Sequence, residues 1–383
     1  MPQLSARHPV RALALMTVAA VLATGAPAHA EESSAAAAFQ VGVTFEKANA
    51  DSWNDPGSVA DAKEILASLG PLQNQHIMGF GAEDPEPSPG VYDWGSLDER
   101  MDLIAETGGT AVITLCSAPG WMKPGWAEAA AIEGEEEREE ALDAIRWNMD
   151  LAPLPQYYDE FAALSAKVAQ RYPQVRYFQV WNEFKGFWDD ARNRWDHEGY
   201  TAMYNQVYAA VKAVRSDAQI GGPYVSLNTY WGGQSHPSTE LKDATWGTAD
   251  QRDLDAMTYW LANKTGAQFF TIDTWSRTRD GHHQNATATK EMFADITAWV
   301  RSKTTLPIWW SEFYAPAAAG SEASTPALMR AAVEGVRDGG ASVALWWGPE
   351  CDSVLPCLWT STQNPGGGQV TGYTALAREF SGR

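Results

Sequence analysis

Residues 175–183, VRYFQVWNE, and residues 306–313, LPIWWSEF, decide how this chain is expected to fold. Each stretch begins with an apolar, aromatic-rich run that is typical of a buried β-strand, and each carries a glutamate two residues after that run. We predict strands over Val175–Trp181 and Leu306–Trp310, with Glu183 and Glu312 directly after them. The rest of the chain repeats the same pattern around these two stretches.

Short β-rich runs alternate with amphipathic stretches along almost the whole chain. The other predicted strands are Phe39–Phe45, His76–Phe80, Thr110–Cys116, Gln219–Val225, Phe269–Asp273 and Ser342–Trp347. The predicted helices, with apolar residues at three- and four-residue steps, are Val59–Leu69, Leu97–Thr107, Tyr157–Arg171, Tyr200–Arg215, Leu254–Asn263, Lys290–Lys303, Pro326–Arg337 and Tyr373–Phe380.

Eight strand–helix units in succession predict an α/β protein, specifically a single closed (β/α)8 TIM barrel. A doubly wound open sheet is the alternative. It would often carry a glycine-rich phosphate loop after its first strand, and none follows Phe45. After Trp347 the sequence has room for a loop and one helix, so we expect no accessory β-sandwich.

The N-terminal 30 residues have the composition of a secretion signal. Arg7 and Arg11 precede an apolar run, Ala12–Thr24, that is too short to span a bilayer, and Ala28-His29-Ala30 fits a cleavage site. We therefore expect residues 1–30 to be a signal peptide and residues 31–383 to be a secreted catalytic barrel. We expect no later segment to cross a membrane.

The formal net charge of −20 argues against nucleic acid or an anionic membrane as the partner. It suits an exported enzyme with a neutral substrate. The acidic run Glu133–Glu140 lacks a fixed ligand spacing, so we interpret it as a solvated loop or helix face.

Three cysteines are present, and an exported chain tends to pair them. Cys351 and Cys357 flank five residues and could close one loop, although the sequence leaves this pairing open. Cys116 ends an apolar strand and is expected to be a buried free thiol.

The two glutamates are the candidate catalytic pair. Active sites of TIM barrels lie at the C-terminal ends of the strands, and Glu183 and Glu312 end the predicted fourth and seventh strands. Side chains from these two ends can meet over the barrel mouth. A pair of carboxyl groups at such a site is the machinery that cleaves glycosidic bonds.

Four segments in order resemble the clan A glycoside hydrolases: GVYDW at 90–94 with Leu97-Asp98, SAPGWM at 117–122, WNE at 181–183 and Glu312. Family 39, which includes β-xylosidases and α-L-iduronidases, looks closest. The resemblance implies a retaining mechanism without metal or cofactor. It implies that Glu183 is the acid/base, Glu312 the nucleophile and Asn182 the partner of the sugar 2-hydroxyl.

Aromatic residues at strand ends are the candidate sugar-binding residues, because aromatic faces stack on sugar rings. They are Trp121, Trp275, Tyr314, Trp346 and Trp347. The last two point to opposite sides of a strand, and the clan pattern suggests that one of them forms the floor of the site. Further tryptophans outside the predicted elements either form outer subsites or pack the loops that carry them: Trp53, Trp147, Trp188, Trp195, Trp231 and Trp246.

The sequence departs from the clan at two strands. The second strand reads Gln75-His76-Ile77 where many members carry an arginine, and the sixth carries Asp273 where many carry His or Tyr. Asp273 could contact a sugar hydroxyl, adjust the charge of Glu312 or cap a loop. The adjacent pair His282-His283 lacks a completed ligand set, so we expect no metal there.

The sequence as a whole predicts a secreted retaining glycosidase that acts on an oligo- or polysaccharide. Two alternatives stay open at this stage: a carbohydrate-binding barrel without catalysis, and a polysaccharide lyase. A lyase would need a base beside a uronic acid and a group that neutralises it, which the acidic composition disfavours.

Overall fold

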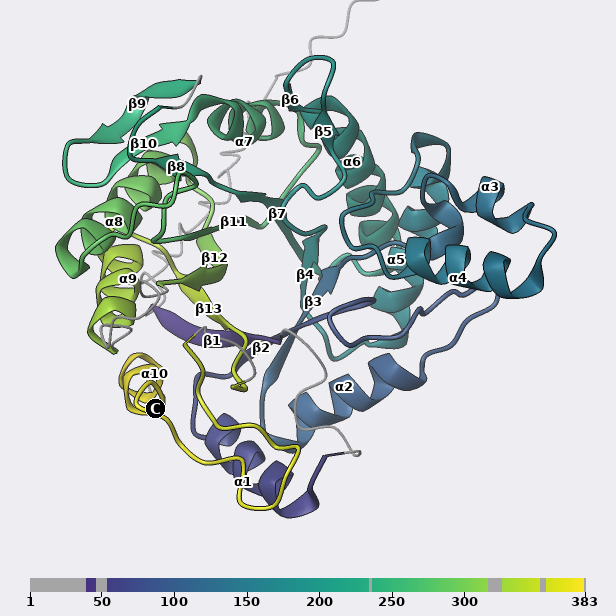
Figure 1. Ribbon diagram of the computed structural model, residues 1–383, viewed down its shortest axis with the longest axis horizontal. Helices are drawn as coiled ribbons and strands as arrows, with labels where there is room; N and C mark the ends of the chain where they lie inside the picture. Colours follow the sequence, from purple (N-terminus) through teal and green to yellow (C-terminus); the bar gives the residue numbers. More distant parts are fainter. Residues whose placement is uncertain (1–38, 46–53, 234–235, 316–325, 352–355, 382–383) are drawn as a thin grey trace, which may run out of the picture. The chain divides into compact units, whose positions relative to one another are not determined.

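Eight parallel strands close into a barrel in the computed structural model, which describes residues 39–45, 54–233, 236–315, 326–351 and 356–381. Figure 1 shows the barrel at the centre with helices around it. The strands are β1 (Gln40–Thr44), β2 (Leu72–His76), β3 (Thr110–Leu115), β4 (Tyr177–Val180), β7 (Gln219–Ser226), β11 (Phe269–Trp275), β12 (Ile308–Tyr314) and β13 (Val343–Trp347). The predicted (β/α)8 TIM barrel is confirmed.

All eight predicted helices are present, with small shifts at their ends. The helices are α1 (Pro56–Ala67), α2 (Gly95–Glu106), α3 (Trp126–Ala130), α4 (Glu135–Arg146), α5 (Tyr158–Arg171), α6 (His197–Val214), α7 (Gln251–Asn263), α8 (Ala286–Lys303), α9 (Pro326–Asp338) and α10 (Thr374–Phe380). The additional α3 and α4 lie in the connection after β3. Part of the acidic run forms the first turn of α4, where carboxylates interact favourably with the helix dipole.

Two small antiparallel sheets extend the loops at the C-terminal ends of the strands. One pairs β5 (Trp188–Asp189) with β6 (Arg194–Trp195), and the other has the order β8 (Thr229–Tyr230), β10 (Gly247–Asp250), β9 (Pro237–Asp243). In Figure 1 the second sheet lies outside the barrel, next to α7 and α8. Among the described residues after β13, α10 is the one regular element, so no accessory sandwich follows the barrel there.

The prediction of the second strand was wrong by four residues, since β2 spans Leu72–His76 and not His76–Phe80. Its sequence, LQNQH, is polar yet fully buried. The outward side chains find partners on α2: Gln73 donates to Thr107 at 2.9 Å, and Gln75 accepts from Arg100 at 2.8 Å. Hydrogen bonding therefore replaces the apolar pattern by which a buried strand is usually recognised.

The barrel interior is layered. Apolar side chains fill its lower part, at Leu72, Val112, Phe269, Trp309, Val343 and Leu345. A polar layer lies above them. In it Asn74 donates to Thr44 at 3.1 Å, Thr114 donates to Asn74 at 2.8 Å, and Gln179 donates to Thr114 at 3.2 Å. Ser311 on β12 donates to Gln179 and closes the network. These bonds fix the strands directly beneath the barrel mouth.

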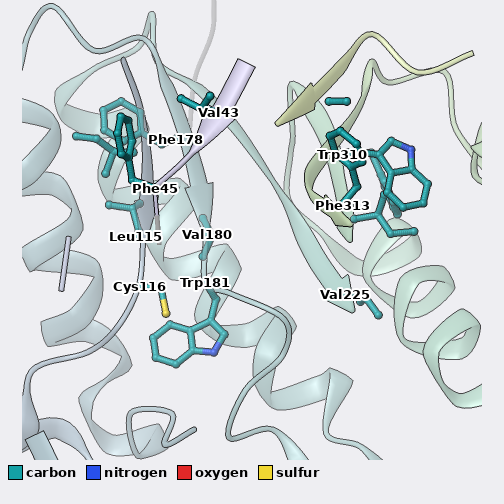
Figure 2. Close-up of a cluster of buried hydrophobic side chains, with 14 of the residues drawn as sticks. Val43, Phe45, Leu115, Cys116, Phe178, Val180, Trp181, Val225, Trp310 and Phe313 are labelled. Carbon is teal, nitrogen blue, oxygen red and sulfur yellow. The ribbon is translucent and has the colours of Figure 1, made fainter. Parts of the chain in front are cut away.

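A larger apolar cluster packs the strands against the surrounding helices. Figure 2 shows part of it, including Phe178 of β4 and Trp310 of β12. Cys116 belongs to this cluster and is free, as predicted; burial raises the pKa of its thiol to about 12. Cys351 and Cys357 form a disulfide with a Cα–Cα distance of 5.0 Å. The pairing that the sequence left open is therefore present.

The described residues all belong to one structural unit, which begins at Ala38. The predicted signal peptide, residues 1–30, lies outside the described residues. Among the helices that are described, none combines the length and the apolar character that a membrane span requires.

Candidate active site

Glu312 reaches the barrel mouth through an irregularity in strand pairing. Trp310 points outward and packs against Phe293 of α8, so regular alternation would turn Glu312 outward as well. The register between β11 and β12 shifts after Ile272, and Asp273 comes to lie opposite Glu312. Both carboxyl groups consequently line the cavity at the strand ends. Such shifts commonly re-aim side chains beside active sites.

Glu183 is held by a turn of unusual backbone geometry directly after β4. Trp181, Glu183 and Phe184 have φ values of 70°, 51° and 57°, which non-glycine residues adopt only when their surroundings enforce it. Here the flanking aromatics are anchored: the Trp181 indole donates to the Lys185 carbonyl at 2.8 Å, and Phe184 stacks on Tyr200 at 4.0 Å. These contacts direct Glu183 into the cavity.

The cavity above the barrel has a volume of about 320 Å³ and brings three carboxyl groups together. One side-chain oxygen from each of Glu183, Asp273 and Glu312 lies within 4.8 Å of those of the other two. The full lining comprises Glu183, Lys185, Ser226, Leu227, Asn228, Asp273, Trp275, Arg279, Glu312, Tyr314 and Trp347. A volume of this size is ordinary for a small-molecule site.

Two tyrosine hydroxyls donate to Glu312, one to each carboxylate oxygen. Tyr224 donates to Oε1, and Tyr314 donates to Oε2 at 2.7 Å. Burial and the nearby charge of Glu183 raise the pKa of Glu312, while the two tyrosines and the Lys185 ammonium oppose this rise. The tyrosines therefore orient Glu312 and favour its ionised form.

Lys185 forms an ion pair with Glu183, with 2.8 Å between Nζ and Oε2. Its ammonium also lies 5.3 Å from the centre of the Phe80 ring. Burial opposes the charge of Lys185, but the charge of Glu183 and the hydrogen bond to it outweigh burial and raise the pKa of the lysine. The cavity thus contains a fixed positive charge beside one of its carboxylates.

Asp273 lies between the two glutamates and is fully enclosed. Burial, then the charges of Glu183 and Glu312, raise its pKa well above the ordinary value, and Asp273 also hydrogen-bonds with Glu183. Since like charges this close cannot all remain ionised, the neutral acid is the favoured form of Asp273. Among the described residues, these three carboxyl groups form a cluster that is close enough to share a cation. Positive charge is already supplied at Glu183 by the Lys185 ammonium.

Four of the predicted binding residues line the cavity: Asp273, Trp275, Tyr314 and Trp347. Trp121 does not, because it is buried, its indole donates to the Glu86 carbonyl at 2.9 Å, and its ring packs against Tyr157. Trp346 is also buried in the outer core, where its indole donates to the Pro356 carbonyl at 2.8 Å. Trp121 and Trp346 therefore do not line this cavity, and the structure gives no support there for their predicted sugar contacts.

Asn182 lies beside Glu183, with 3.4 Å between Nδ2 and Oε2, and it is buried. Its side-chain oxygen has no hydrogen-bond partner among the described residues, so it retains the capacity to accept a hydrogen bond. His76 interacts with Asn182 and packs against Phe80 and Trp347. Burial lowers the pKa of His76 to about 3, and the ring is neutral.

Several functional candidates escaped the sequence analysis: Lys185, Tyr224, Asn228, Arg279 and His76. Lys185 is two residues from Glu183 in the sequence, and this proximity could have marked it as a candidate site residue. Tyr224 gives no such signal. Tyr224 has no partner in the pairing between β7 and β11, because Pro223 pairs with Thr271 and Val225 pairs with the next residue, Ile272. Its φ is 56°.

A family model agrees with this architecture. The glycoside hydrolase family 42 model, described as beta-galactosidase, matches residues 51–216, which include the WNE segment. With the closed barrel and the glutamates on its fourth and seventh strands, this match defines the class of the protein: the chain is a clan A glycoside hydrolase, an enzyme that hydrolyses O-glycosyl bonds. The clan-level prediction is confirmed.

Solved structures show the same fold at low sequence identity. The chain is similar to a monomeric beta-xylosidase from Caulobacter crescentus CB15 (16% identity, TM-score 0.56) and to the GH39 enzyme from Xanthomonas axonopodis pv. citri (18%, 0.54). It covers 68% and 65% of those two chains, and 90% of its own length matches each.

An endo-1,4-beta-D-mannanase from Thermotoga petrophila RKU-1 is 14% identical with a TM-score of 0.54; the match covers 90% of this chain and 99% of that one. No curated protein sequence matches. At such identities the solved structures establish the fold alone.

Proposed function

We propose that this protein is a secreted retaining glycosidase that cleaves an oligo- or polysaccharide through a glycosyl-enzyme intermediate. The placement of Glu183 and Glu312 carries the proposal, since both line one cavity and one carboxyl oxygen of each lies within 4.8 Å of an oxygen of the other. Retaining enzymes hold the two carboxyl groups about 5–5.5 Å apart, whereas inverting enzymes need about 6.5–9.5 Å for an intervening water.

Glu312 is the nucleophile in this proposal. Its two tyrosine donors fix both carboxylate oxygens and favour the charged form that attacks the anomeric carbon. Glu183 first protonates the leaving oxygen as that bond breaks. It then removes a proton from the water that attacks the anomeric carbon and releases Glu312, so two inversions give net retention.

The proton for Glu183 has a local source in Asp273. The Lys185 ammonium pairs with the carboxylate form of Glu183, whereas the first step needs its acid form. Asp273 hydrogen-bonds with Glu183 and favours the neutral acid. We assign Asp273 to deliver this proton as substrate enters and separates Glu183 from Lys185; after turnover Glu183 holds the proton taken from water and returns it to Asp273 as the ion pair with Lys185 forms again. The sugar contact that the sequence predicts for Asp273 stays a prediction beside this role.

A neutral carbohydrate fits the charge of the chain and the aromatic cavity walls at Trp275 and Trp347. The N-terminal signal-like segment supports export. The alternatives are less favoured. A barrel that only binds carbohydrate would not need two hydrogen-bond donors on Glu312. A lyase would need a group that neutralises a uronic acid, and Lys185 in this cavity is already paired with Glu183.

A hydrolysis screen tests the proposal. The mature protein is incubated with p-nitrophenyl glycosides of several sugars and with plant and microbial polysaccharides, beside a Glu312→Gln variant of equal thermal stability. We expect turnover of at least one aryl glycoside by the wild type and none by the variant. Turnover by neither protein, or equal turnover by both, would contradict the proposal.

A further inference from the structure

Trp231 presents a flat, solvent-facing indole beside the catalytic cavity. Its side chain is 48% exposed, more than Trp147 at 41% or Trp188 at 38%, the other exposed tryptophans described. Isolated exposed apolar residues are common on protein surfaces, so exposure alone assigns no role. The position and support of Trp231 distinguish it from the others.

Two cavity-lining segments meet at Trp231. The chain runs from Asn228, a cavity wall residue, through β8 directly into Trp231. Arg279 lines the same cavity from the loop after β11, and its backbone N–H donates to the Thr229 carbonyl at 2.7 Å. Trp231 therefore follows, three residues on, a residue that lines the cavity on the side formed by β7 and β11.

The indole is held in one orientation. His282 stacks against it with 4.1 Å between ring centres and an interplanar angle of 15°. Asp280 accepts from the backbone N–H groups of Trp231 and Gly232 at 3.0 Å and 2.9 Å. The imidazole covers one face, and the exposure of the ring leaves the other face to solvent. A preorganised aromatic face loses little conformational entropy when a flat ligand stacks on it.

The two other exposed tryptophans lack this arrangement. Trp188 packs edge-on against Trp195, and the Arg252 guanidinium lies 4.9 Å from its ring centre. Trp147 ends α4, outside the cavity lining. Trp188 also follows a cavity-lining residue, Lys185, by three positions, but among these three tryptophans only Trp231 has a stacked imidazole behind its ring.

We propose that the open face of Trp231 is an outer sugar-binding subsite, which stacks on a pyranose ring of a substrate chain that continues out of the catalytic cavity. This inference rests on the proposed function and narrows its substrate class to chains that extend beyond the cavity. The aryl monoglycosides used in the hydrolysis screen end within the cavity and do not reach Trp231.

Binding in a non-hydrolysing background tests the subsite directly. Calorimetric titrations use β-1,4-linked xylo- and manno-oligosaccharides, from disaccharide to hexasaccharide, with Glu312→Gln alone and combined with Trp231→Ala. We expect Trp231→Ala to weaken the longer chains of the bound series by roughly tenfold, about 1.4 kcal/mol, and to leave the shortest chain within about twofold. Trp147→Ala in the same background is the matched control, because this exposed tryptophan follows α4 outside the cavity lining, and it should change neither.

The outcomes separate the subsite from the proposed function. A loss that is equal at all chain lengths, no loss, or no binding of either series by the parent would overturn the subsite. Wild-type turnover of an aryl glycoside is measured alongside, so a failed subsite with intact turnover leaves the proposed function standing. Thermal melts of all variants confirm that they are folded.

Discussion

Replacing Tyr224 by phenylalanine tests how the site controls its nucleophile. The hydroxyl donates to Glu312 Oε1 in a fully buried environment, and Tyr314 holds the other oxygen. A hydrogen bond to a charged group contributes about 1.5–3 kcal/mol. At about 1.36 kcal/mol per pKa unit, its loss raises the pKa of Glu312 by roughly 1–2 units.

The sign of the effect on activity follows from the charge that attack requires. The tyrosine hydroxyl stabilises the carboxylate, so Tyr224→Phe favours the protonated, non-nucleophilic form of Glu312. The acidic limb of the kcat/KM profile should therefore move to higher pH by about 1–2 units. At pH values on that limb, kcat/KM of the variant should be roughly 10- to 100-fold lower than that of the wild type. The measurement is kcat/KM for an activated aryl glycoside across the pH range.

Tyr204→Phe is the matched control, because this tyrosine is equally buried but donates to the Gly266 carbonyl at 2.9 Å and is absent from the cavity lining. Its pH profile should match the wild type, although it loses stability of about 1 kcal/mol. An acidic limb that stays in place in Tyr224→Phe, or that moves to lower pH, would refute the role assigned to the tyrosine.

Three further substitutions probe the carboxyl groups. Glu312→Ala should abolish turnover without unfolding the protein, and azide should restore it by forming a glycosyl azide of inverted configuration; near-native turnover would remove its assignment as nucleophile. Glu183→Ala should slow substrates with poor leaving groups by about 100- to 10,000-fold and activated ones far less, and equal losses would mark it as structural. Asp273→Asn keeps the size of the side chain but not its proton, so it should show the same dependence on leaving group at roughly 10- to 100-fold; rates unchanged for poor leaving groups would exclude proton delivery.

The barrel was predictable because its strands and helices follow regular apolar periods. The strand at Leu72–His76 escaped because its polar side chains find hydrogen-bond partners such as Thr107 and Arg100, which lie far along the sequence. The direction of side chains at the strand ends was harder still to predict. Glu312 lies inside β12, and two register shifts decide which side chains turn inward. No periodicity in the sequence encodes such shifts.

The same limit explains the binding residues. An aromatic residue at a strand end can face the cavity, as Trp347 does, or the outer core, as Trp121 and Trp346 do, and residue type does not distinguish the two. Glu183 and Glu312 could be singled out as the candidate pair because glutamates embedded in apolar segments have few structural uses. Their partners Tyr224 and Lys185 depend on three-dimensional contacts that the sequence leaves open.

The central claim is that Glu183 and Glu312 act by double displacement, and the anomeric configuration of the first-formed product tests it most directly. Proton NMR spectra are recorded during hydrolysis of an aryl glycoside, before mutarotation equilibrates the sugar. Carboxyl oxygens within 4.8 Å predict a first product with the configuration of the substrate. An inverted first product would contradict the covalent mechanism and the roles of both glutamates.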